Sequence, residues 1–531
     1  MSTHTAFPAE FAAKYKAAGY WQDKPLTDIL FDQAAANPEQ IAIIDASQVP
    51  AQQFSYLQLA EQVDKLAAFF SQQGLQAQDT AIVQLPNGQL FYTIYFALLK
   101  IGVLPVNALF NHNKKELDNY LEQLKPKLVI YSNAHKLFQT TEYLDQVKQN
   151  YQDTICFNDQ ELQQYLTQDS EFSLAKKAVL NPDAVAFYQL SGGSTGTPKL
   201  IPRTHNDYFY SVRQSIEVCQ WSSATRYLLT LPAAHNFSLS SPGALGVFMA
   251  GGTLVIASDP SPTSCFPLIE KYQVNWTALV PPALLLWLDA AKRQRNKLAN
   301  LQYIQVGGAK LNPNVAERVE PELGITLQQV FGMAEGLVNY TRLDDDEWTR
   351  LNTQGKPMSD LDEVKIVDVN GAEVGTGEVG LLTTRGPYTF RGYYNAPSAN
   401  QQAFDQDGFY CSGDLVKQTA SGHLIVVGRE KEQINRGGEK IDAQEIENEL
   451  LSHPDVQNVA LISIDDALLG EKSCAIIVSR SDLLTPVAIR KYLRVQGVAD
   501  YKIPDQIKFV DELPLTAVGK IDKRTLRLRC L

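Results

Sequence analysis

The sequence predicts an α/β protein with a large N-terminal domain of helix-covered sheets plus a small β-barrel, followed by a small α+β C-terminal domain. Apolar β-branched runs alternate with helical patterns through the first 300 residues, as in parallel sheets covered by helices. Short strands separated by turn signals then fill residues 364–427. A break at residues 428–431 precedes a last compact unit, so we expect domains at residues 1–430 and 431–531.

The elements expected within the first domain follow from short apolar runs. Residues 90–101 are mostly apolar and long enough for a buried helix. The expected strands are residues 81–85, 127–131, 253–257 and 303–306. Beyond residue 364, the turn signals are Asn370-Gly371, Asp407-Gly408 and Ser421-Gly422. Such pairs join antiparallel strands, and here they predict a small barrel.

The last unit opens with a predicted helix. Asp442 is a suitable N-cap residue, and Glu445, three residues later, completes a capping box. The apolar face of this helix would consist of Ile446, Leu450 and Leu451. Strands are expected at residues 456–464 and 475–478, which makes this unit α+β.

Length and composition narrow the possible partners. At 531 residues the chain exceeds what one core supports, and a net charge of −12 argues against nucleic acid, whose phosphates dominate such binding. No stretch is apolar enough to cross a bilayer, and no secretory signal opens the chain. The six cysteines form no pair at metal-ligand spacing, which favours reduced thiols. We therefore expect a cytoplasmic protein that binds neither nucleic acid nor membranes.

A run rich in glycine and hydroxyl side chains is the strongest local signal. It consists of Ser191, Gly192, Gly193, Ser194, Thr195, Gly196, Thr197, Pro198 and Lys199. The glycines let the backbone approach an anion, and the hydroxyl and N–H groups can surround phosphate oxygens. The spacing departs from the Walker A motif. A polar linker is the alternative, but so dense a run favours a phosphate-binding loop.

This run resembles the phosphate loop of the adenylate-forming superfamily, and other motifs of that superfamily follow in the expected order across essentially the whole chain. One segment resembles the motif whose glutamate, here Glu335, holds Mg²⁺. A second resembles the motif whose aspartate, here Asp414, binds the ribose hydroxyls. The break between the domains resembles the superfamily's hinge, here Lys431, and a C-terminal segment resembles the motif with the catalytic lysine, here Lys520.

The resemblance implies an ATP-binding site assembled from several segments. The residues expected to contact ATP are Ser191, Gly192, Gly193, Ser194, Thr195, Gly196, Lys199, Gly307, Gly308, Ala309, Val330, Phe331, Gly332, Met333, Ala334, Asp414 and Arg429. The implied catalytic residues are Lys520, His235 and Glu335, and Glu335 is also the implied metal ligand. A hard carboxylate suits Mg²⁺ that is held partly by triphosphate oxygens. A flexible lysine can neutralise charge on an attacking carboxylate and on the α-phosphate.

The implied reaction is in-line attack of a carboxylate on the α-phosphorus of ATP, which gives an acyl-AMP and pyrophosphate. Positioning and charge neutralisation would carry most of the catalysis. In the superfamily, a mobile C-terminal domain then rotates about the hinge, which would remove Lys520 from the cleft and open a tunnel for a thiol. The Gly437-Gly438 pair lies where the superfamily places this tunnel, although a plain turn would also explain it.

Residues 232–243 indicate which acid is activated. They resemble the corresponding segment of 2,3-dihydroxybenzoate–AMP ligases, in which an asparagine (here Asn236) meets the 2-hydroxyl and a serine (here Ser241) lies near the 3-hydroxyl. Buried polar groups reject ligands that cannot pair with them, although helix capping could also explain both side chains. Salicylate-specific relatives tend to carry cysteine at the serine position. The implied substrate-binding residues are Asn236, Phe237, Ser241, Gly308 and Val338; Phe237 departs from the usual tyrosine.

The resemblance therefore implies a ligase that uses ATP and Mg²⁺ to activate 2,3-dihydroxybenzoate and delivers it to the phosphopantetheine of an aryl carrier protein on another chain, for siderophore assembly. One alternative is a salicylate or benzoate ligase that uses coenzyme A as the acceptor. A second alternative is a non-catalytic scaffold with the same fold. Such a scaffold would be expected to lose Lys520, Asp414 or Glu335, and all three are present.

Overall fold

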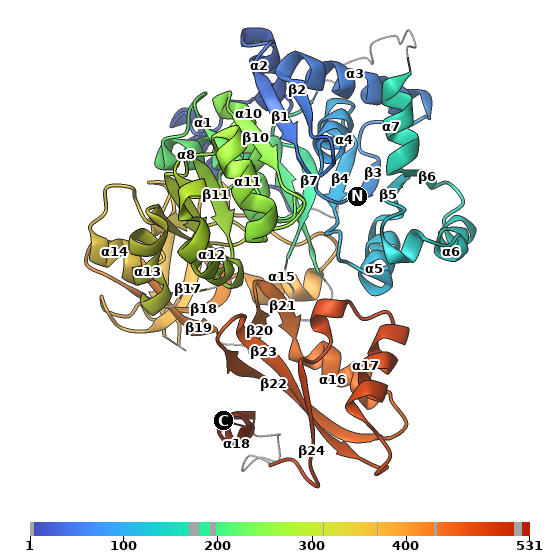
Figure 1. Ribbon diagram of the computed structural model, residues 1–531, viewed down its shortest axis with the longest axis vertical. Coiled ribbons are helices and arrows are strands. Elements are labelled where there is room, and N and C mark those ends of the chain that lie inside the picture. The colour runs from blue at the N-terminus through green and yellow to red at the C-terminus, as the bar shows by residue number, and fades with distance from the viewer. Residues whose placement is uncertain are drawn as a thin grey trace.

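In the computed structural model, the strands gather into four sheets, of which two are large and mostly parallel (Figure 1). The structure describes residues 5–168, 180–191, 198–308, 310–311, 313–368, 370–429, 433–514 and 523–530. Across these ranges, every helix is too short or too polar to pass through a bilayer.

The larger sheet has nine strands. They are β1 (Ile41–Asp45), β2 (Gln52–Ser55), β9 (Arg226–Leu229), β10 (Thr253–Ile256), β11 (Trp276–Leu279), β12 (Tyr303–Val306), β13 (Thr326–Gly332), β14 (Val338–Tyr340) and β15 (Lys356–Pro357). Their spatial order is β15-β14-β13-β12-β11-β9-β10-β1-β2. The strands from β13 to β1 run parallel, whereas β2, β14 and β15 are antiparallel to their neighbours. The strands predicted at residues 253–257 and 303–306 are confirmed as β10 and β12.

The second large sheet has six strands. They are β3 (Thr80–Gln84), β4 (Leu104–Asn107), β5 (Leu128–Tyr131), β6 (Ile155–Asn158), β7 (Val185–Leu190) and β8 (Leu200–Thr204), in the spatial order β6-β5-β3-β4-β7-β8. Only β8, at one edge, is antiparallel to its neighbour. The strands predicted at residues 81–85 and 127–131 are confirmed as β3 and β5.

Helices between the two large sheets share one hydrophobic core with both. They are α3 (Tyr56–Gln72), α4 (Gln89–Lys100), α8 (His205–Cys219) and α10 (Gly243–Ala250), and α4 confirms the helix predicted at residues 90–101. Because side chains alternate along a strand, Ile43 faces this shared core while Ile44 faces the outer helices. The outer helices are α11 (Pro262–Tyr272), α12 (Pro281–Gln294) and α13 (Pro313–Leu323) on the larger sheet, and α5 (Lys114–Leu124) and α6 (Glu142–Asn150) on the smaller.

Shorter helices complete this part of the chain. They are α1 (Ala9–Ala17), α2 (Asp28–Ala36), α7 (Asp159–Thr167), α9 (Asn236–Ser240), α14 (Glu347–Asn352) and α15 (Pro397–Ala403). The 3₁₀ segments are Lys136–Phe138, Arg295–Leu298 and Asp500–Lys502.

The antiparallel strands expected after residue 364 are present, but they do not close into a barrel. They are β16 (Glu363–Val367), β17 (Gly380–Arg385), β18 (Tyr410–Gln418) and β19 (Leu424–Arg429), in sequence order. The outer edge of β19 is bonded to the loop before β15: Gln354 N donates to Leu424 O, and Leu424 N donates to Gly355 O. Because this edge is already paired, β19 does not reach β16, and the sheet stays open.

The C-terminal segment (residues 433–530) forms the fourth sheet, which lies below the others in Figure 1. Its strands are β20 (Gln433–Arg436), β21 (Glu439–Asp442), β22 (Val456–Asp466), β23 (Gly470–Ser479) and β24 (Gln506–Phe509). Helices α16 (Ala443–Leu451) and α17 (Pro486–Val495) pack on one core of this sheet, and α18 (Lys523–Cys530) packs on another. The predicted helix and both predicted strands of this unit are confirmed, although Leu451 is exposed rather than buried.

Candidate active site

A cavity lies at the ends of the parallel strands, where ligands of α/β sheets commonly bind. Its walls come from the ends of β4 and β7, from α9, from the segment after β12, from the β13–β14 hairpin and from two parts of the C-terminal segment. The predicted site residues that line it are Ser191, His235, Asn236, Phe237, Ser241, Gly308, Val330, Gly332, Met333, Ala334, Glu335 and Val338. Residues from separate motifs, predicted to share a site, are therefore brought together.

Five other predicted residues lie outside the cavity walls. Lys199 is bonded back to Ser191, whose N donates to Lys199 O over 2.9 Å. Gly307 lies behind the ring of Phe237. Phe331 is on β13, and Asp414 is a buried residue of β18, opposite Arg429 on β19. The predicted residues Gly192, Gly193, Ser194, Thr195, Gly196, Ala309, Lys431 and Lys520 fall outside the described residues.

The short helix α9 and the residue after it carry the polar groups predicted to select the acid. Asn236 begins α9 and Ser241 directly follows it, so both side chains reach the same cavity. The Tyr208 hydroxyl donates to Asn236 Oδ1 over 2.9 Å. Ser241 is buried. Of the two predicted specificity residues, Asn236 is thus supported from behind by a buried tyrosine, Tyr208.

A flat apolar slot lies beside these polar groups. Phe237 and Val338 line it, and Gly307 lies so close behind Phe237 that an added Cβ would be 3.2 Å from the ring and 2.8 Å from Val330 O. Glycine at position 307 therefore lets the aromatic ring pack directly on the backbone. A slot with one aromatic wall and hydrogen-bonding groups at its end suits a planar hydroxylated ring.

His235 forms the entrance to this slot. Its Nδ1 accepts a hydrogen bond from Phe237 N over 3.3 Å, which fixes the ring at the start of α9. The side chain is exposed to the cavity, but the surrounding protein restricts its access to water. This desolvation, together with the charge of Lys440, lowers the pKa of His235 to about 4. The imidazole is therefore neutral at physiological pH and can accept or donate a hydrogen bond without adding charge.

Glu335 brings a carboxylate to the opposite wall. It is 8% exposed, and the Tyr393 hydroxyl donates to Glu335 Oε1 over 2.9 Å. Lys199 Nζ lies 4.8 Å from the centroid of the Tyr393 ring, so this tyrosine connects the end of the predicted phosphate loop to Glu335. The described residues contain no cluster of three or more His, Cys, Asp or Glu side chains suited to a metal. A cation at Glu335 would thus take most of its ligands from a bound polyphosphate and water, as Mg²⁺ commonly does.

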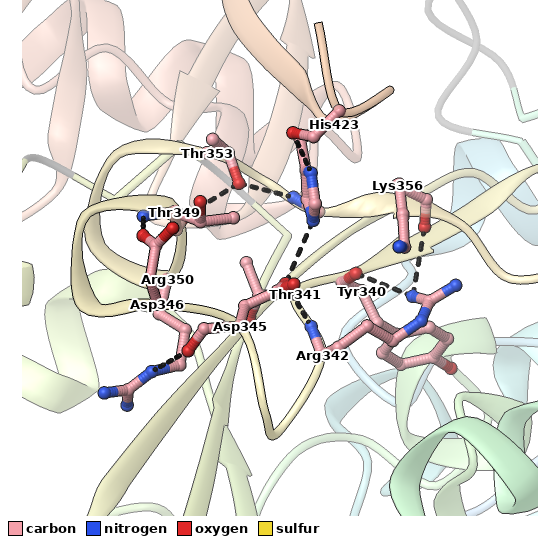
Figure 2. Close-up of polar contacts among 12 residues, drawn as sticks. Tyr340, Thr341, Arg342, Asp345, Asp346, Thr349, Arg350, Thr353, Lys356 and His423 are labelled. Atoms are coloured by element: carbon pink, nitrogen blue, oxygen red, sulfur yellow. Dashed lines mark hydrogen bonds and ion pairs between the residues drawn. The ribbon is translucent and has the colours of Figure 1, made fainter. Parts of the chain in front are cut away.

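Polar contacts behind β14 hold the strand that carries Val338 (Figure 2). Arg342 donates to the carbonyl oxygens of Tyr340 and Pro357 over 2.8 and 2.7 Å, which ties β14 to β15. The backbone N of Arg342 donates to Asp345 Oδ2, and the same carboxylate oxygen lies 2.9 Å from His423 Nε2. The cluster therefore joins the wall of the cavity to the turn between β18 and β19.

The C-terminal segment closes the cavity on one side. Gly438, Glu439, Lys440, Tyr501 and Lys502 all line it. Among them, Gly438 belongs to the glycine pair predicted to border a thiol tunnel. Asn435 Nδ2 donates to Gly308 O over 3.4 Å, which brings the first strand of this segment against a residue predicted to contact ATP.

Several residues of the site were not singled out from the sequence. Gln189 lines the cavity, and its only sequence signal is a polar side chain at the end of an apolar strand directly before the glycine-rich run. Tyr208 lies on α8, and no motif in the sequence singles it out. Lys440, Tyr501 and Lys502 reach the cavity only because the C-terminal segment folds against it, and no local pattern indicates this.

Known protein families match most of the chain. Residues 30–394 match the family described as AMP-binding enzyme, and residues 445–520 match the AMP-binding enzyme C-terminal domain. Among curated proteins, the chain is 53% identical to enterobactin synthase component E of Escherichia coli, over 98% of this chain and 97% of that protein. It is 47% identical to the vibriobactin-specific 2,3-dihydroxybenzoate-AMP ligase of Vibrio cholerae, over 99% and 97% of the two chains.

A salicylate-directed relative and a solved structure are also similar over nearly their whole length. The salicyl-AMP ligase / salicyl-S-ArCP synthetase of Mycobacterium tuberculosis is 40% identical, over 98% of this chain and 93% of that protein. The apo structure of Mycobacterium smegmatis MbtA has a TM-score of 0.76 and 40% identity, with complete coverage of both chains. The observed α/β arrangement is therefore one that a relative at substantial identity also adopts.

Proposed function

Because the chain belongs to the AMP-binding enzyme family, we propose that it activates 2,3-dihydroxybenzoate with ATP and then transfers the aryl group to the phosphopantetheine thiol of an aryl carrier protein in siderophore biosynthesis. The observation that carries this proposal is the pairing of Asn236 and Ser241 in one cavity beside the Phe237 slot. Two hydrogen-bonding groups at the end of a planar slot match the two adjacent hydroxyls of a catechol acid.

The first half-reaction needs positioning and charge neutralisation more than covalent chemistry. A carboxylate oxygen of the acid attacks the α-phosphorus, the bond to the bridging oxygen of pyrophosphate breaks, and pyrophosphate leaves with the electron pair. We assign Lys520 to the developing charge around the α-phosphate. Neutral His235 at the mouth of the slot can hydrogen-bond the attacking carboxylate without forming a static ion pair with it. Glu335, buried and held by Tyr393, fits a role as the protein's carboxylate ligand to Mg²⁺, which would neutralise triphosphate charge when bound.

We assign the remaining residues of the site to ATP binding. Gly308, Val330, Gly332, Met333 and Ala334 line the cavity and would enclose the adenine and ribose. Their backbone groups come from two neighbouring strand ends. We assign Asp414 and Arg429 to the nucleotide as well, and this requires a nucleotide that extends beyond the described cavity walls.

The second half-reaction would use the C-terminal segment. The thiolate of phosphopantetheine attacks the acyl carbon, a thioester forms, and AMP leaves with the electron pair of the broken acyl–phosphate bond. We propose that residues 1–430 and 431–531 are separate domains and that Lys431 is the hinge between them. The position of Gly438 in the cavity wall supports a thiol entrance on this side. Cys156, Cys219, Cys265, Cys411 and Cys474 are free thiols, which agrees with a cytoplasmic location.

The test is acid-dependent ATP–pyrophosphate exchange with 2,3-dihydroxybenzoate, salicylate, benzoate and a fatty acid. We expect the highest kcat/KM with 2,3-dihydroxybenzoate, a lower value with salicylate, and exchange near background with the fatty acid. A thioester assay should then favour an aryl carrier protein over coenzyme A. Preference for salicylate or benzoate with coenzyme A as acceptor would establish the alternative ligase, and no exchange with any acid would reject the enzyme.

A further inference from the structure

A chain of hydrogen bonds runs from Gln189 through Tyr208, both buried, and ends on Asn236 in the cavity wall. Gln189 Nε2 donates to the Tyr208 hydroxyl over 3.4 Å, and this hydroxyl donates to Asn236 Oδ1 over 2.9 Å. Gln189 and Tyr208 are 2% and 1% exposed. Ser240 Oγ adds a weaker contact to the same Asn236 oxygen, at 3.5 Å. The acceptor end of the Asn236 amide is therefore occupied from the protein side.

The direction of these bonds decides which end of the amide faces the ligand. A tyrosine hydroxyl has one proton, and here that proton points at Asn236 Oδ1 while the hydroxyl oxygen accepts from Gln189. Burial raises the pKa of Tyr208, so the hydroxyl keeps its proton at neutral pH. Among the residues that the structure describes, Asn236 Nδ2 has no protein acceptor. Asn236 also lines the cavity, so its two N–H donors are the groups available to a bound acid.

An ortho-hydroxybenzoate needs a donor at this place. Its hydroxyl proton is held in an internal hydrogen bond to the neighbouring carboxylate, so the hydroxyl oxygen presents only lone pairs to a binding site. An asparagine that offered its carbonyl oxygen would leave two acceptors facing each other, which is costly in a buried site. An asparagine that offers its N–H group makes a satisfied hydrogen bond.

We infer that Tyr208 is a positioning residue that locks the Asn236 amide with its N–H donors toward the ortho-hydroxyl oxygen of the acid. The inference rests on the proposed function and deepens it, because it assigns the ortho-hydroxyl preference to a residue outside the cavity wall. Without the Tyr208 hydroxyl, the amide can rotate, because its carbonyl oxygen keeps only the weak Ser240 contact from the protein side.

The surroundings of Tyr208 explain why its ring stays in place. It lies on α8, whose first turn is fixed by a capping box between Thr204 and Asp207. The Arg203 guanidinium lies 4.9 Å from the centroid of the Tyr208 ring and bonds Asp207 Oδ1 over 2.9 Å. Arg203 is itself held by Ala334 O, on the far wall of the cavity. The ring is thus anchored independently of its hydroxyl, so removing only that hydroxyl leaves the packing intact.

The experiment compares Tyr208→Phe with Tyr210→Phe in the full-length protein. Tyr210 lies on the same helix and is also 1% exposed, but its hydroxyl donates to Ser359 Oγ over 2.6 Å, away from Asn236. Pyrophosphate exchange is measured with salicylate, 3-hydroxybenzoate and benzoate. For Tyr208→Phe we expect kcat/KM to fall about tenfold with salicylate and to change less than twofold with the other two acids, since one hydrogen bond is lost only to the ortho-hydroxyl. Tyr210→Phe should leave the salicylate-to-benzoate ratio unchanged.

A double-mutant cycle separates positioning from general damage. In an Asn236→Ala background, Tyr208→Phe should cause no further change in the salicylate-to-benzoate ratio, because the amide it positions is gone. If Tyr208→Phe does not fold, Gln189→Met removes the donor to the hydroxyl from the other side and should lower the same ratio. An equal fall with all three acids, or an unchanged ratio, would overturn the inference. A wild-type protein inactive with every aromatic acid would instead reject the proposed function.

Discussion

Lys502 Nζ lies 2.9 Å from Glu116 Oε1, although 386 residues separate them in sequence. Lys502 belongs to the C-terminal segment and Glu116 to α5, so the ion pair crosses between the two parts of the molecule. Their side chains are 3% and 1% exposed. Glu445 Oε2 lies 3.1 Å from the same ammonium group, and Lys115 contacts Glu445 in turn. The C-terminal segment is therefore held against α5 by a buried group of alternating charges.

The charges of this group are coupled. Burial alone would lower the pKa of Lys502, but the neighbouring carboxylates outweigh it and raise the pKa above the ordinary value. Burial would likewise raise the pKa of Glu116, but Lys502 outweighs it and lowers the pKa. For Glu445, burial prevails and the pKa is raised. Lys502 is therefore charged at neutral pH and is paired with both Glu116 and Glu445.

Replacing Lys502 by methionine should release the C-terminal segment from α5. Removing one partner of a buried ion pair leaves an uncompensated charge, which costs about 3–5 kcal/mol. We expect faster hydrogen exchange in α5 and α16 and no change in the nine-stranded sheet. Lys114→Met is the control, because Lys114 is exposed and its ion pair is with Asp118 on the surface of the same helix, not with the C-terminal segment. Equal exchange in α5 for both variants would show that Lys502 does not hold the segment.

Asp362 is a half-buried residue with a desolvated carboxyl group, and this desolvation raises its pKa to about 7. The Tyr388 hydroxyl donates to Asp362 Oδ2 over 2.6 Å and accepts a hydrogen bond from Val338 N over 3.0 Å. Asp362 is thus connected through one tyrosine to a residue of the cavity wall. In the folded state this carboxyl group keeps its proton at pH values where the unfolded chain has lost it.

Asp362→Asn should therefore change how stability depends on pH. Because the folded pKa is raised above an unfolded value near 4, the contribution of Asp362 to stability is fully present below pH 4 and is lost as pH rises to about 7. Between pH 5 and 8, the wild type should lose about 3 kcal/mol relative to the asparagine variant, measured by urea unfolding. The exposed neighbour Asp360 gives the comparison: its charge helps to raise the pKa of Asp362, so Asp360→Asn should weaken this slope without removing it. Parallel pH profiles for Asp362→Asn and wild type would contradict the prediction.

Ser241→Cys should shift the acid preference from 2,3-dihydroxybenzoate toward salicylate. A thiol is a weaker hydrogen-bond partner than a hydroxyl, so the 3-hydroxyl loses stabilisation that salicylate never had. We expect the ratio of kcat/KM for the two acids to fall about fivefold to tenfold in the exchange assay. Ser238→Cys is the control, because Ser238 lies on α9, which Ser241 directly follows, and its hydroxyl donates to His235 O instead of reaching the cavity. An unchanged ratio would remove Ser241 from the specificity of the site.

Local sequence patterns predict the strands and helices whose formation depends on neighbouring residues. The strands at residues 81–85 and 303–306 and the helix at residues 90–101 follow from apolar runs whose length and neighbours suit one element. The cavity residues at the ends of β7 and β13 and on α9 could be predicted because they belong to short motifs with a recognisable spacing. The barrel prediction was wrong because closure depends on what covers the edge of β19, and Gln354 supplies that cover from a distant loop.

Long-range pairing is the part that the sequence does not reveal. Glu445 fits a capping box by its spacing, yet its carboxylate bonds Lys502, 57 residues away, in a buried ion pair. The sequence around Tyr208 does not indicate that its hydroxyl donates to Asn236 in the folded protein. Both contacts depend on tertiary packing between distant segments. The sequence pattern of one segment does not indicate its contact with the other.

Lys520→Ala should separate the two half-reactions. If Lys520 stabilises charge that develops at the α-phosphate, its loss should lower kcat/KM for pyrophosphate exchange by at least about a hundredfold. Transfer of the aryl group from supplied aryl-AMP to the carrier thiol should stay within a few-fold of wild type, because that step breaks a different bond and does not need this charge. Lys508→Ala is the control: Lys508 is an exposed residue of β24 in the same segment, and its loss should affect neither step. Near-normal exchange by Lys520→Ala would end the catalytic assignment, and an equal loss of both steps would show a structural role instead.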